Sequence, residues 1–208
     1  AFGKEAYLLT GYLNVPKLLE LALNNGVDPV TGRQISIVTG DAREFRSFED
    51  LYSAFLKQLE YVVLEKIKVN NYIDRMFAKY APATFLSVLI DDCIAKGKDY
   101  YNGGPRYNTN YIQCTGLGTV TDAMSSIKKH VFEEGRYTMD RMLEMLKADF
   151  KGHEFDRQWI INHTSFFGND DEYADSIAVR VYNDLFKAIE GRPNIKGSCY
   201  HMNMLSTT

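Results

Sequence analysis

Apolar positions along the chain recur mostly three or four residues apart, which is the spacing of one face of an α-helix. A first helix is predicted to begin at Asn14 and to stop at Gly26. A much longer helix begins at Ser47, where Asp50 completes a start resembling a capping box, and extends to about Tyr80. Further helices are predicted over residues 82–97, 121–134, 138–150 and 169–191.

One of these helices differs from the others in its pattern. Residues 83–90 are almost wholly apolar, and Gly97 supplies the stop signal. A helix that is apolar on so many sides is typical of a protein interior. We therefore expect this helix to be buried.

Three short segments have the character of β-strands, with helices and loops between them. Residues 34–38 follow turn residues and predict a brief strand or hairpin arm at the surface. Residues 111–115 precede a Gly-Leu-Gly turn and a helix, and residues 199–205 form the last candidate. Strands so widely separated favour parallel pairing in a helix-rich α/β layer or barrel.

The ends of the sequence suggest an incomplete domain. The chain begins at Ala1 without an initiator methionine and stops at Thr208 within a strand-like pattern. Three short strands cannot close a barrel, so the remaining sheet partners are expected outside this sequence. We therefore predict that residues 1–208 are an internal part of one domain, truncated at both ends.

Composition excludes several classes of protein. The chain is 45% hydrophobic and 25% charged, with a net charge of −3, which is ordinary for a soluble protein. A mild acidic excess argues against a nucleic-acid binder. No apolar run approaches the roughly 20 residues of a membrane span, and no signal peptide is apparent. A soluble, cytoplasmic protein is the expectation.

Few residues suggest reactive or metal-binding chemistry. Cys93, Cys114 and Cys199 are odd in number and lie in apolar surroundings, which predicts reduced, mostly buried thiols. The cysteines and the four histidines show no metal-ligand spacing. We predict no metal site.

Two polar motifs favour structural roles. Gly116-Leu117-Gly118 resembles a phosphate-binding turn but lacks the third glycine of the dinucleotide fingerprint, so a tight turn between strand and helix is favoured. Asp91 and Asp92 are candidates for acid–base work, but pairing with a basic group such as Arg106 is the preferred interpretation.

The last strand carries the clearest site signal, because side chains alternate between the two faces of a strand. Residues 199, 201, 203, 205 and 207 share a mixed polar face, and residues 200, 202, 204 and 206 share the other. In an α/β barrel the mostly apolar face would meet the helices. The mixed face would line the interior, where ligands bind.

Several ordered segments of the chain resemble the glycyl radical enzyme family, which includes pyruvate formate-lyase-like proteins. They are the opening AFGKEAYLLTGY, the helix KLLELALNNG, and the runs SVLIDDC, GGPRYN and TVTD. The resemblance covers essentially the whole chain. The opening segment and the final MLSTT are most similar to the branch that dehydrates trans-4-hydroxy-L-proline.

This resemblance implies a ten-stranded α/β barrel with a cysteine loop and a glycine loop at its centre. A separate iron–sulfur, S-adenosylmethionine-dependent activating enzyme would install the glycyl radical, which makes a thiyl radical on the cysteine. The thiyl would take a hydrogen atom from the substrate, and a glutamate near the cysteine would help the hydroxyl leave, giving pyrroline-5-carboxylate. The reactive cysteine, glutamate and glycine are expected outside this chain, so it holds no catalytic residue. A homodimeric enzyme of anaerobic metabolism is implied.

Substrate-binding residues can be carried over from the family at three positions. Tyr12 matches a tyrosine near the substrate, and Leu205 and Thr207 match strand residues that close over the proline ring. Ser206 departs from the pattern, because proline is expected there. The alternatives are another glycyl radical lyase, such as a diol or glycerol dehydratase or a formate acetyltransferase-like enzyme, and a non-catalytic helical binding protein if the termini are native.

Overall fold

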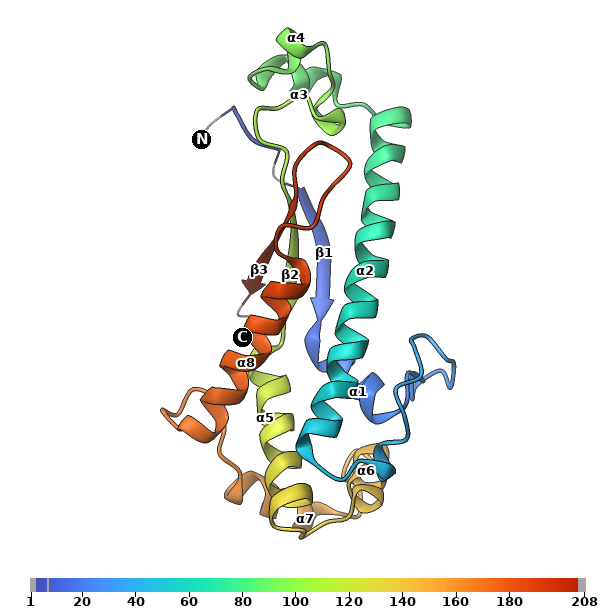
Figure 1. Cartoon of the computed structure of the whole chain (residues 1–208), viewed down its shortest axis with the longest axis vertical. Coiled ribbons are helices and arrows are strands. Elements are labelled where there is room, and N and C mark those ends of the chain that lie inside the picture. Colours follow the sequence, from blue (N-terminus) through green and yellow to red (C-terminus); the bar gives the residue numbers. More distant parts are fainter. Residues whose placement is uncertain (1–2, 7, 206–208) are drawn as a thin grey trace. The chain divides into compact units, whose positions relative to one another are not determined.

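The computed structural model describes residues 3–6 and 8–205. Its chain divides into two compact units, each assembled from segments that are distant in sequence. The sheet unit comprises residues 1–13, 62–115 and 185–205, and the helical unit comprises residues 14–61 and 116–184. The helices and strands, labelled in Figure 1, are β1 (Leu8–Asn14), α1 (Val15–Leu23), α2 (Phe48–Tyr80), α3 (Thr84–Leu89), α4 (Cys93–Lys96), β2 (Asn110–Thr115), α5 (Leu117–Ile127), α6 (Met139–Lys147), α7 (Glu154–His163), α8 (Glu172–Ile189) and β3 (Tyr200–Leu205).

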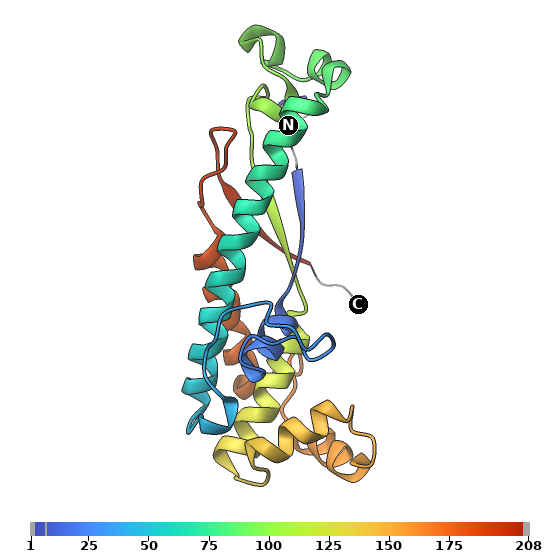
Figure 2. The ribbon, with the colours of Figure 1, turned by 90° about the vertical axis from the view of Figure 1, so that its right-hand side faces the viewer.

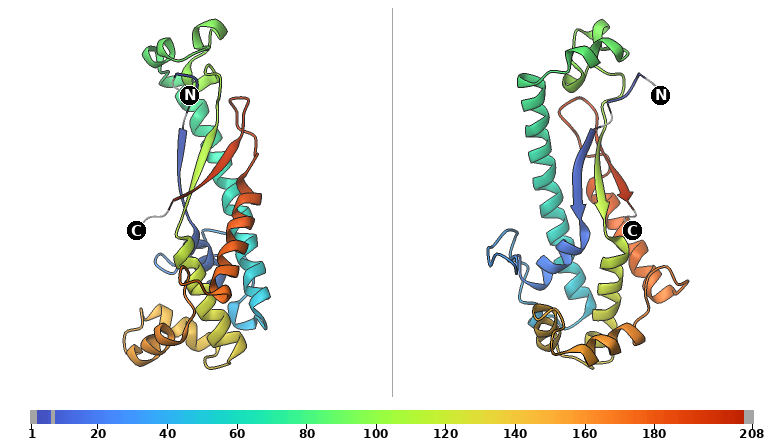
Figure 3. Two further views of the ribbon diagram at one scale, coloured as in Figure 1. Left: turned by 90° about the vertical axis from the view of Figure 1, so that its left-hand side faces the viewer. Right: turned by 180° about the vertical axis from the view of Figure 1, so that it is seen from behind.

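The sheet has the strand order β1-β2-β3. Strands β2 and β3 are parallel, with Asn110 opposite Tyr200 and Thr115 opposite Leu205. Figure 3 shows the three arrows side by side and running in the same direction. The parallel α/β arrangement expected from the sequence is therefore confirmed within the described residues.

One face of the sheet packs on the second half of α2, which lies on one side of the strands in Figure 2. Ile112, Cys114 and Tyr200 are completely buried there. The Tyr200 hydroxyl donates a hydrogen bond of 3.0 Å to Asn71 Oδ1 of α2. The face of β3 that contains Tyr200 thus meets a helix, as its alternation predicts.

Strand β1 was not predicted, because Gly11 interrupts its apolar pattern. Gly11 has a φ of +85°, and a Cβ atom at this position would lie 3.3 Å from Lys66 Nζ of α2. Glycine within a strand often marks such a close approach. The segment 34–38, which was predicted to be a brief strand or hairpin arm, contributes Gln34 to a single antiparallel bridge with Val27.

The buried helix predicted over residues 82–97 is wrong. The structure contains two short helices, α3 and α4, separated where Asp92 takes a positive φ of 75°. Phe85 is 79% exposed and Val88 is 62% exposed, and α3 contains no buried residue. The apolar run therefore forms an exposed surface of this chain.

Helix starts in the helical unit follow the capping residues. Asn14 Oδ1 accepts a 3.3 Å hydrogen bond from Lys17 N at the start of α1. Asp50 Oδ2 accepts from Ser47 N at 3.0 Å, and Ser47 Oγ accepts from Asp50 N at 3.2 Å, which completes a capping box before α2. These reciprocal bonds satisfy backbone donors that a helix start would otherwise leave unpaired.

The core of the helical unit is built from the apolar faces of α1, α5, α6 and the helical-unit parts of α2 and α8. Its buried side chains include Leu18, Leu19, Leu51, Phe55, Val120, Met124, Met142, Met145, Ile177 and Val181. None of the helices in the described part of the chain combines the length and the hydrophobicity of a membrane span.

Candidate functional site

The face of the sheet that points away from α2 carries the predicted substrate-facing residues, and we call it the open face. Residues directly opposite each other in a parallel pair point to the same side. Because Ile112 and Cys114 face α2, the alternating positions on β2 and β3 lie on the open face. These positions form the pairs Tyr111–His201, Gln113–Asn203 and Thr115–Leu205.

Strand β1 adds Tyr12 to the open face. Its neighbour Leu13 is only 4% exposed, and Gly11 approaches Lys66 of α2, so both lie on the helix side. Tyr12 alternates with them and is 67% exposed. The Thr10 hydroxyl donates to the backbone oxygen of Tyr111 at 2.9 Å, which ties this edge of β1 to β2.

Two of the three predicted substrate-binding residues therefore share one face. Tyr12 and Leu205 both lie on the open face, on the outer strands of the sheet. Thr207, like Ser206, lies outside the described residues. Its placement beside Leu205 stays a prediction based on the two-residue alternation of the strand.

A polar cluster that sequence reasoning missed surrounds His201. Its Nδ1 lies 2.5 Å from Glu190 Oε1, and its Nε2 lies 3.6 Å from Cys199 Sγ. Because an ionised carboxylate can only accept, the Nδ1 proton points to Glu190. Glu190 Oε2 also accepts from Met202 N at 3.1 Å, so the carboxylate holds both the imidazole and the strand backbone. The only sequence signal was the two-residue spacing of Cys199 and His201.

A second polar cluster lies between the sheet and α2. Asn110 Nδ2 donates to Asp74 Oδ2 at 3.0 Å, and Lys196 Nζ lies 3.3 Å from the same oxygen. Asn194 Nδ2 donates to Asn110 Oδ1 at 2.8 Å. Burial lowers the pKa of Lys196, because desolvation disfavours the charged ammonium. The cluster holds the segment that leads into β3 against α2.

The cysteines are free and mostly shielded. Cys93 and Cys114 are buried, and Cys199 is partly exposed. Burial raises the pKa of the Cys114 thiol to about 12 and raises the pKa of Cys93. A thiol with a raised pKa is a poor nucleophile, because the thiolate is the reactive form. The predicted inert role therefore fits Cys93 and Cys114.

Asp92 has the structural role that was expected of the aspartate pair. Arg106 Nη2 donates to Asp92 Oδ1 at 2.8 Å, and Arg106 Nε donates to Asp92 Oδ2 at 3.1 Å. This two-pronged contact holds the pKa of Asp92 below its usual value, first through the hydrogen bonds and also through the positive charge of Arg106. The contact between Asp92 and Arg106 thus holds the loop before β2 against the segment between α3 and α4.

Gly116 forms the tight turn before α5, and Leu117 and Gly118 already belong to that helix. Gly116 takes a φ of +85°, and a Cβ atom there would lie 2.6 Å from Pro16 Cδ in α1. Only glycine fits both the backbone conformation and the close packing of α1 against the start of α5. These constraints explain why glycine occurs at position 116, and no phosphate-binding role is needed to explain it.

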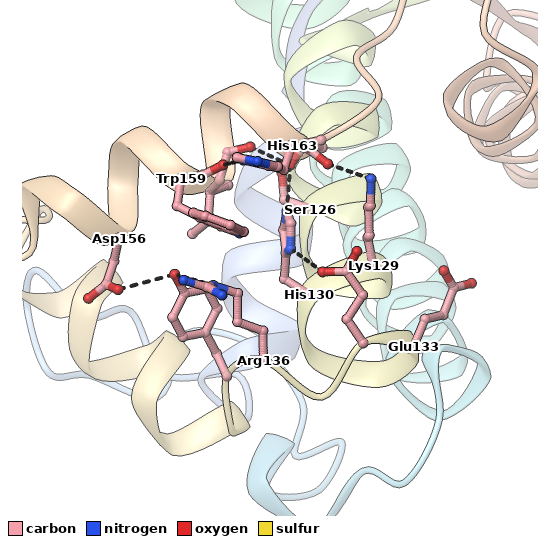
Figure 4. A network of polar contacts seen from close by, with 12 residues as sticks. Ser126, Lys129, His130, Glu133, Arg136, Asp156, Trp159 and His163 are labelled. Carbon is pink, nitrogen blue, oxygen red and sulfur yellow. Dashed lines mark hydrogen bonds and ion pairs between the residues drawn. The ribbon is translucent and has the colours of Figure 1, made fainter.

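The helical unit contains a network of polar contacts, which Figure 4 shows. His130 is completely buried, and its Nδ1 lies 3.0 Å from Glu134 Oε2 while its Nε2 lies 2.9 Å from Thr164 Oγ1. Burial lowers the pKa of His130. His130 belongs to a π-helical segment, Lys128–Glu133, that follows α5. Such segments often occur at functional sites, but both ring nitrogens here have partners within the unit.

Aromatic stacking completes this network. The Trp159 and His163 rings stack with centroids 3.8 Å apart, and the Arg136 guanidinium lies 3.7 Å from the centre of the Trp159 ring. Figure 4 shows Arg136 and His163 beside Trp159. The Arg136 contact joins the loop that follows the π-helical segment to α7, so we assign the network to stability of the helical unit.

Metal binding has no candidate in the part of the chain that the structure describes. No group of three or more histidine, cysteine, aspartate or glutamate side chains is arranged to hold a metal ion there.

Comparison with known proteins gives a match over the full sequence. The model of the family described as pyruvate formate lyase-like matches residues 1–208. The trans-4-hydroxy-L-proline dehydratase of Clostridioides difficile is 49% identical over 207 residues, which cover 100% of this chain and 26% of that protein. The (2S)-3-sulfopropanediol dehydratase of Klebsiella oxytoca is 32% identical over 189 residues, or 89% of this chain and 23% of that protein.

Solved structures of dehydratases also match nearly the whole of this chain. Hydroxyproline dehydratase from Clostridioides difficile, with trans-4-hydroxy-L-proline bound, matches 98% of this chain and 26% of that chain with a TM-score of 0.94 and 49% identity. The B12-independent glycerol dehydratase of Clostridium butyricum, in its glycerol-bound form, matches 96% of this chain and 25% of that chain, with a TM-score of 0.88 and 30% identity. The chain thus spans about a quarter of the length of the relatives that it matches.

Proposed function

Because the chain belongs to the pyruvate formate lyase-like family, we propose that it is part of a glycyl radical dehydratase that eliminates water from trans-4-hydroxy-L-proline. The observation that carries the proposal is the 49% identity, over the whole chain, to a dehydratase of that substrate. The sulfopropanediol and glycerol dehydratases are 32% and 30% identical, which is more distant. The product would be pyrroline-5-carboxylate.

On the resemblance to the family, the reactive groups of the proposed enzyme would lie outside these 208 residues. They are a cysteine that carries the thiyl radical, a glutamate that assists loss of the hydroxyl, and a glycine that stores the radical. An iron–sulfur, S-adenosylmethionine-dependent activating enzyme is the proposed partner that installs the radical. We place the full-length protein in the cytoplasm of anaerobically growing cells, as a homodimer.

This chain would contribute part of the substrate pocket. Tyr12 and Leu205 share the open face, and the alternation of β3 assigns Thr207 to the same side. Tyr12 offers a ring face and a hydroxyl, Leu205 gives shape, and Thr207 offers a hydroxyl for the carboxylate or hydroxyl of the substrate. A pocket closed by such residues would exclude solvent from the radical intermediates.

The alternative is another glycyl radical lyase that acts on a small hydroxylated compound. Ser206 supports it, because a proline is expected at this position in the hydroxyproline branch, and proline fixes φ and removes a backbone donor. The family match over residues 1–208 argues against a non-catalytic helical binding protein.

The test is anaerobic activation of the full-length protein, followed by assays with a substrate panel. We expect pyrroline-5-carboxylate from trans-4-hydroxy-L-proline and no product from glycerol, propane-1,2-diol, sulfopropanediol or isethionate. Turnover of one of these compounds, without turnover of hydroxyproline, would establish the alternative.

A pair of variants tests the pocket assignment. Tyr12→Phe removes a hydroxyl from the open face, whereas Tyr72→Phe removes one from α2, where Tyr72 is 61% exposed. We expect Tyr12→Phe to raise KM about 5- to 10-fold, as expected for one hydrogen bond, and Tyr72→Phe to leave KM unchanged. Equal KM values for both variants would remove Tyr12 from the pocket.

A further inference from the structure

Cys199, His201 and Glu190 contact one another in the order of a nucleophile, a base and the group that orients the base, and we call them the cysteine triad. The Cys199 Sγ atom lies 3.6 Å from His201 Nε2, and His201 Nδ1 lies 2.5 Å from Glu190 Oε1. This is the order of contacts that activates cysteine and serine side chains as nucleophiles. All three residues belong to the sheet unit.

The contacts determine which nitrogen of His201 can act as the base. An ionised Glu190 can only accept a hydrogen bond, so the Nδ1 proton points to it and Nε2 of the neutral imidazole has a free lone pair. That lone pair faces the Cys199 sulfur and can take the thiol proton. The Glu190 carboxylate then stabilises the imidazolium that forms. Met202 N donates to Glu190 Oε2 at 3.1 Å, which holds the carboxylate in place.

Backbone hydrogen bonds between the end of α8 and the start of β3 support this geometry. Gly191 N donates to Tyr200 O at 3.0 Å, and Tyr200 N donates to Arg192 O at 2.7 Å. Pro193 and Cys199 form an antiparallel bridge beside them. The triad is therefore carried by paired backbone segments, which position side chains more closely than a free loop does.

The surroundings of Cys199 differ from those of the other two thiols. Cys93 and Cys114 are buried, whereas Cys199 is partly exposed, and the His201 side chain beside it is 33% exposed. A small reagent can therefore approach this sulfur in the described part of the chain. His201 precedes Leu205 by four positions (205 − 201), which is about 13 Å of strand. The triad is thus at the other end of β3 from the predicted pocket residue.

The presence of a base favours one kind of electrophile. An alkylating reagent such as iodoacetamide releases iodide, which needs no proton. Hydrogen peroxide releases hydroxide, which is a poor leaving group unless it is protonated as it departs. The imidazolium that forms when His201 takes the thiol proton can supply that proton. Hydrogen peroxide is also small and uncharged, so the Glu190 carboxylate does not repel it.

We propose that Cys199 is a modification site for hydrogen peroxide, with His201 accepting the thiol proton and then donating it to the departing hydroxide. The Cys199 sulfur attacks one peroxide oxygen, so an S–O bond forms, the O–O bond breaks and the hydroxide leaves as water. Sulfur is oxidised by two electrons to a sulfenic acid, and the peroxide is reduced to water. Thiols reverse this modification. The proposal does not depend on which compound the full-length protein dehydrates.

The experiment measures the reaction rates of Cys199 in the full-length protein, not activated, so that no radical contributes. Hydrogen peroxide is added in the presence of dimedone, which captures sulfenic acids, and mass spectrometry quantifies the peptide that contains Cys199. Parallel samples are treated with iodoacetamide. The test variants are His201→Gln and Glu190→Gln. The control is His163→Gln, because His163 is an exposed histidine of α7 in the helical unit.

We expect Cys199 to be oxidised about 100-fold faster than glutathione, the lower end of what a positioned acid–base group contributes. His201→Gln should slow oxidation by about 100-fold and alkylation by a smaller factor, because only peroxide requires the returned proton. A change in access to the thiol would slow both reactions alike, so the ratio of the two rates isolates proton transfer. Glu190→Gln should lower this ratio by a smaller factor, and His163→Gln should leave it unchanged.

Two results would overturn the inference. Oxidation of Cys199 in the original protein at the rate of glutathione or slower would show that the thiol is covered or is not activated, and this result requires no variant. An unchanged ratio of oxidation to alkylation in His201→Gln would show that the imidazole has only a structural role. If His201→Gln does not fold, an unchanged ratio in Glu190→Gln leads to the same conclusion.

Discussion

The ion pair between Asp74 and Lys196 allows a quantitative test of how the sheet unit is held together. The Lys196 side chain is 1% exposed and the Asp74 side chain is 10% exposed, with Nζ and Oδ2 3.3 Å apart. No hydrogen bond reaches the Lys196 ammonium from the described residues. Its positive charge is therefore balanced mainly by proximity to one carboxylate. Replacing Asp74 with asparagine would leave that charge buried and unpaired.

The expected magnitude follows from this burial. Removing one partner of a buried ion pair typically costs about 3–5 kcal/mol, because the other charge stays desolvated. Replacing both partners with uncharged residues often changes the free energy of unfolding very little. We therefore expect Asp74→Asn to destabilise the sheet unit by about 3 kcal/mol or more. The double variant with Lys196→Met should recover at least half of this loss.

Hydrogen exchange of the full-length protein provides the assay. Peptides that cover residues 196–205 report the opening of β3, and a loss of about 3 kcal/mol accelerates their exchange about 100-fold. The control is Lys68→Met, because Lys68 pairs with Glu65 but is 68% exposed and an exposed pair contributes less than about 1 kcal/mol. Exchange in Asp74→Asn at the original rate, or no recovery in the double variant, would refute the reasoning.

Three further predictions concern other parts of the fold. Iodoacetamide should alkylate Cys199 well before Cys114, because burial raises the pKa of the Cys114 thiol to about 12. Peptide mass mapping will detect the order of alkylation, and equal rates for the two cysteines would contradict the prediction. Gly116→Ala should lower stability by about 1–3 kcal/mol, measured as a lower melting temperature, because its Cβ would lie 2.6 Å from Pro16 Cδ. Burial lowers the pKa of His130, so as the pH falls this histidine is protonated in the unfolded chain before it is protonated in the folded chain. The free energy of unfolding should therefore fall as the pH drops below about 6.5. A His130→Gln variant should lose this pH dependence in thermal melts, and an unchanged dependence would assign it to other groups.

Local chemistry was sufficient to predict the starts of α1, α2 and α6. Asn14, Ser47 and Thr138 each supply a side-chain oxygen to a backbone N–H within the next three residues. The pairing of Asp92 with Arg106 was also predictable, because charges in one short segment have few other partners. Such features depend on neighbours in sequence, so a single sequence contains them.

Features that depend on distant residues were missed. Strand β1 is recognisable only once Gly11 is seen to approach Lys66, a residue 55 positions away (66 − 11). The Asp74–Lys196 pair spans 122 positions (196 − 74), and no periodic pattern links its members. The apolar run around Phe85 was wrongly predicted to be buried within this chain, for a related reason. Hydrophobicity predicts that a surface is covered, but it does not show which part of a protein covers it.

The candidate pocket was predicted only in part. Alternation along β3 correctly put Leu205 on the face opposite Tyr200, because the two-residue period needs no knowledge of the partner strand. The pairing of Gln113 with Asn203 on the same face was not noticed, because it depends on the register of β2 against β3, which a sequence does not show.

The parallel register of β2 and β3 also has a consequence for protein synthesis. Asn110 and Tyr200 are partners 90 positions apart (200 − 110), and most of the helical unit is encoded between them. At about 5–20 residues per second, a ribosome needs roughly 5–18 seconds to make that interval. During this time β2 has one unpaired edge, and Lys196, the ion-pair partner of Asp74, has not yet been synthesised. We therefore expect the nascent chain to bind chaperones until β3 emerges, with the helical unit, residues 14–61 and 116–184, folding first.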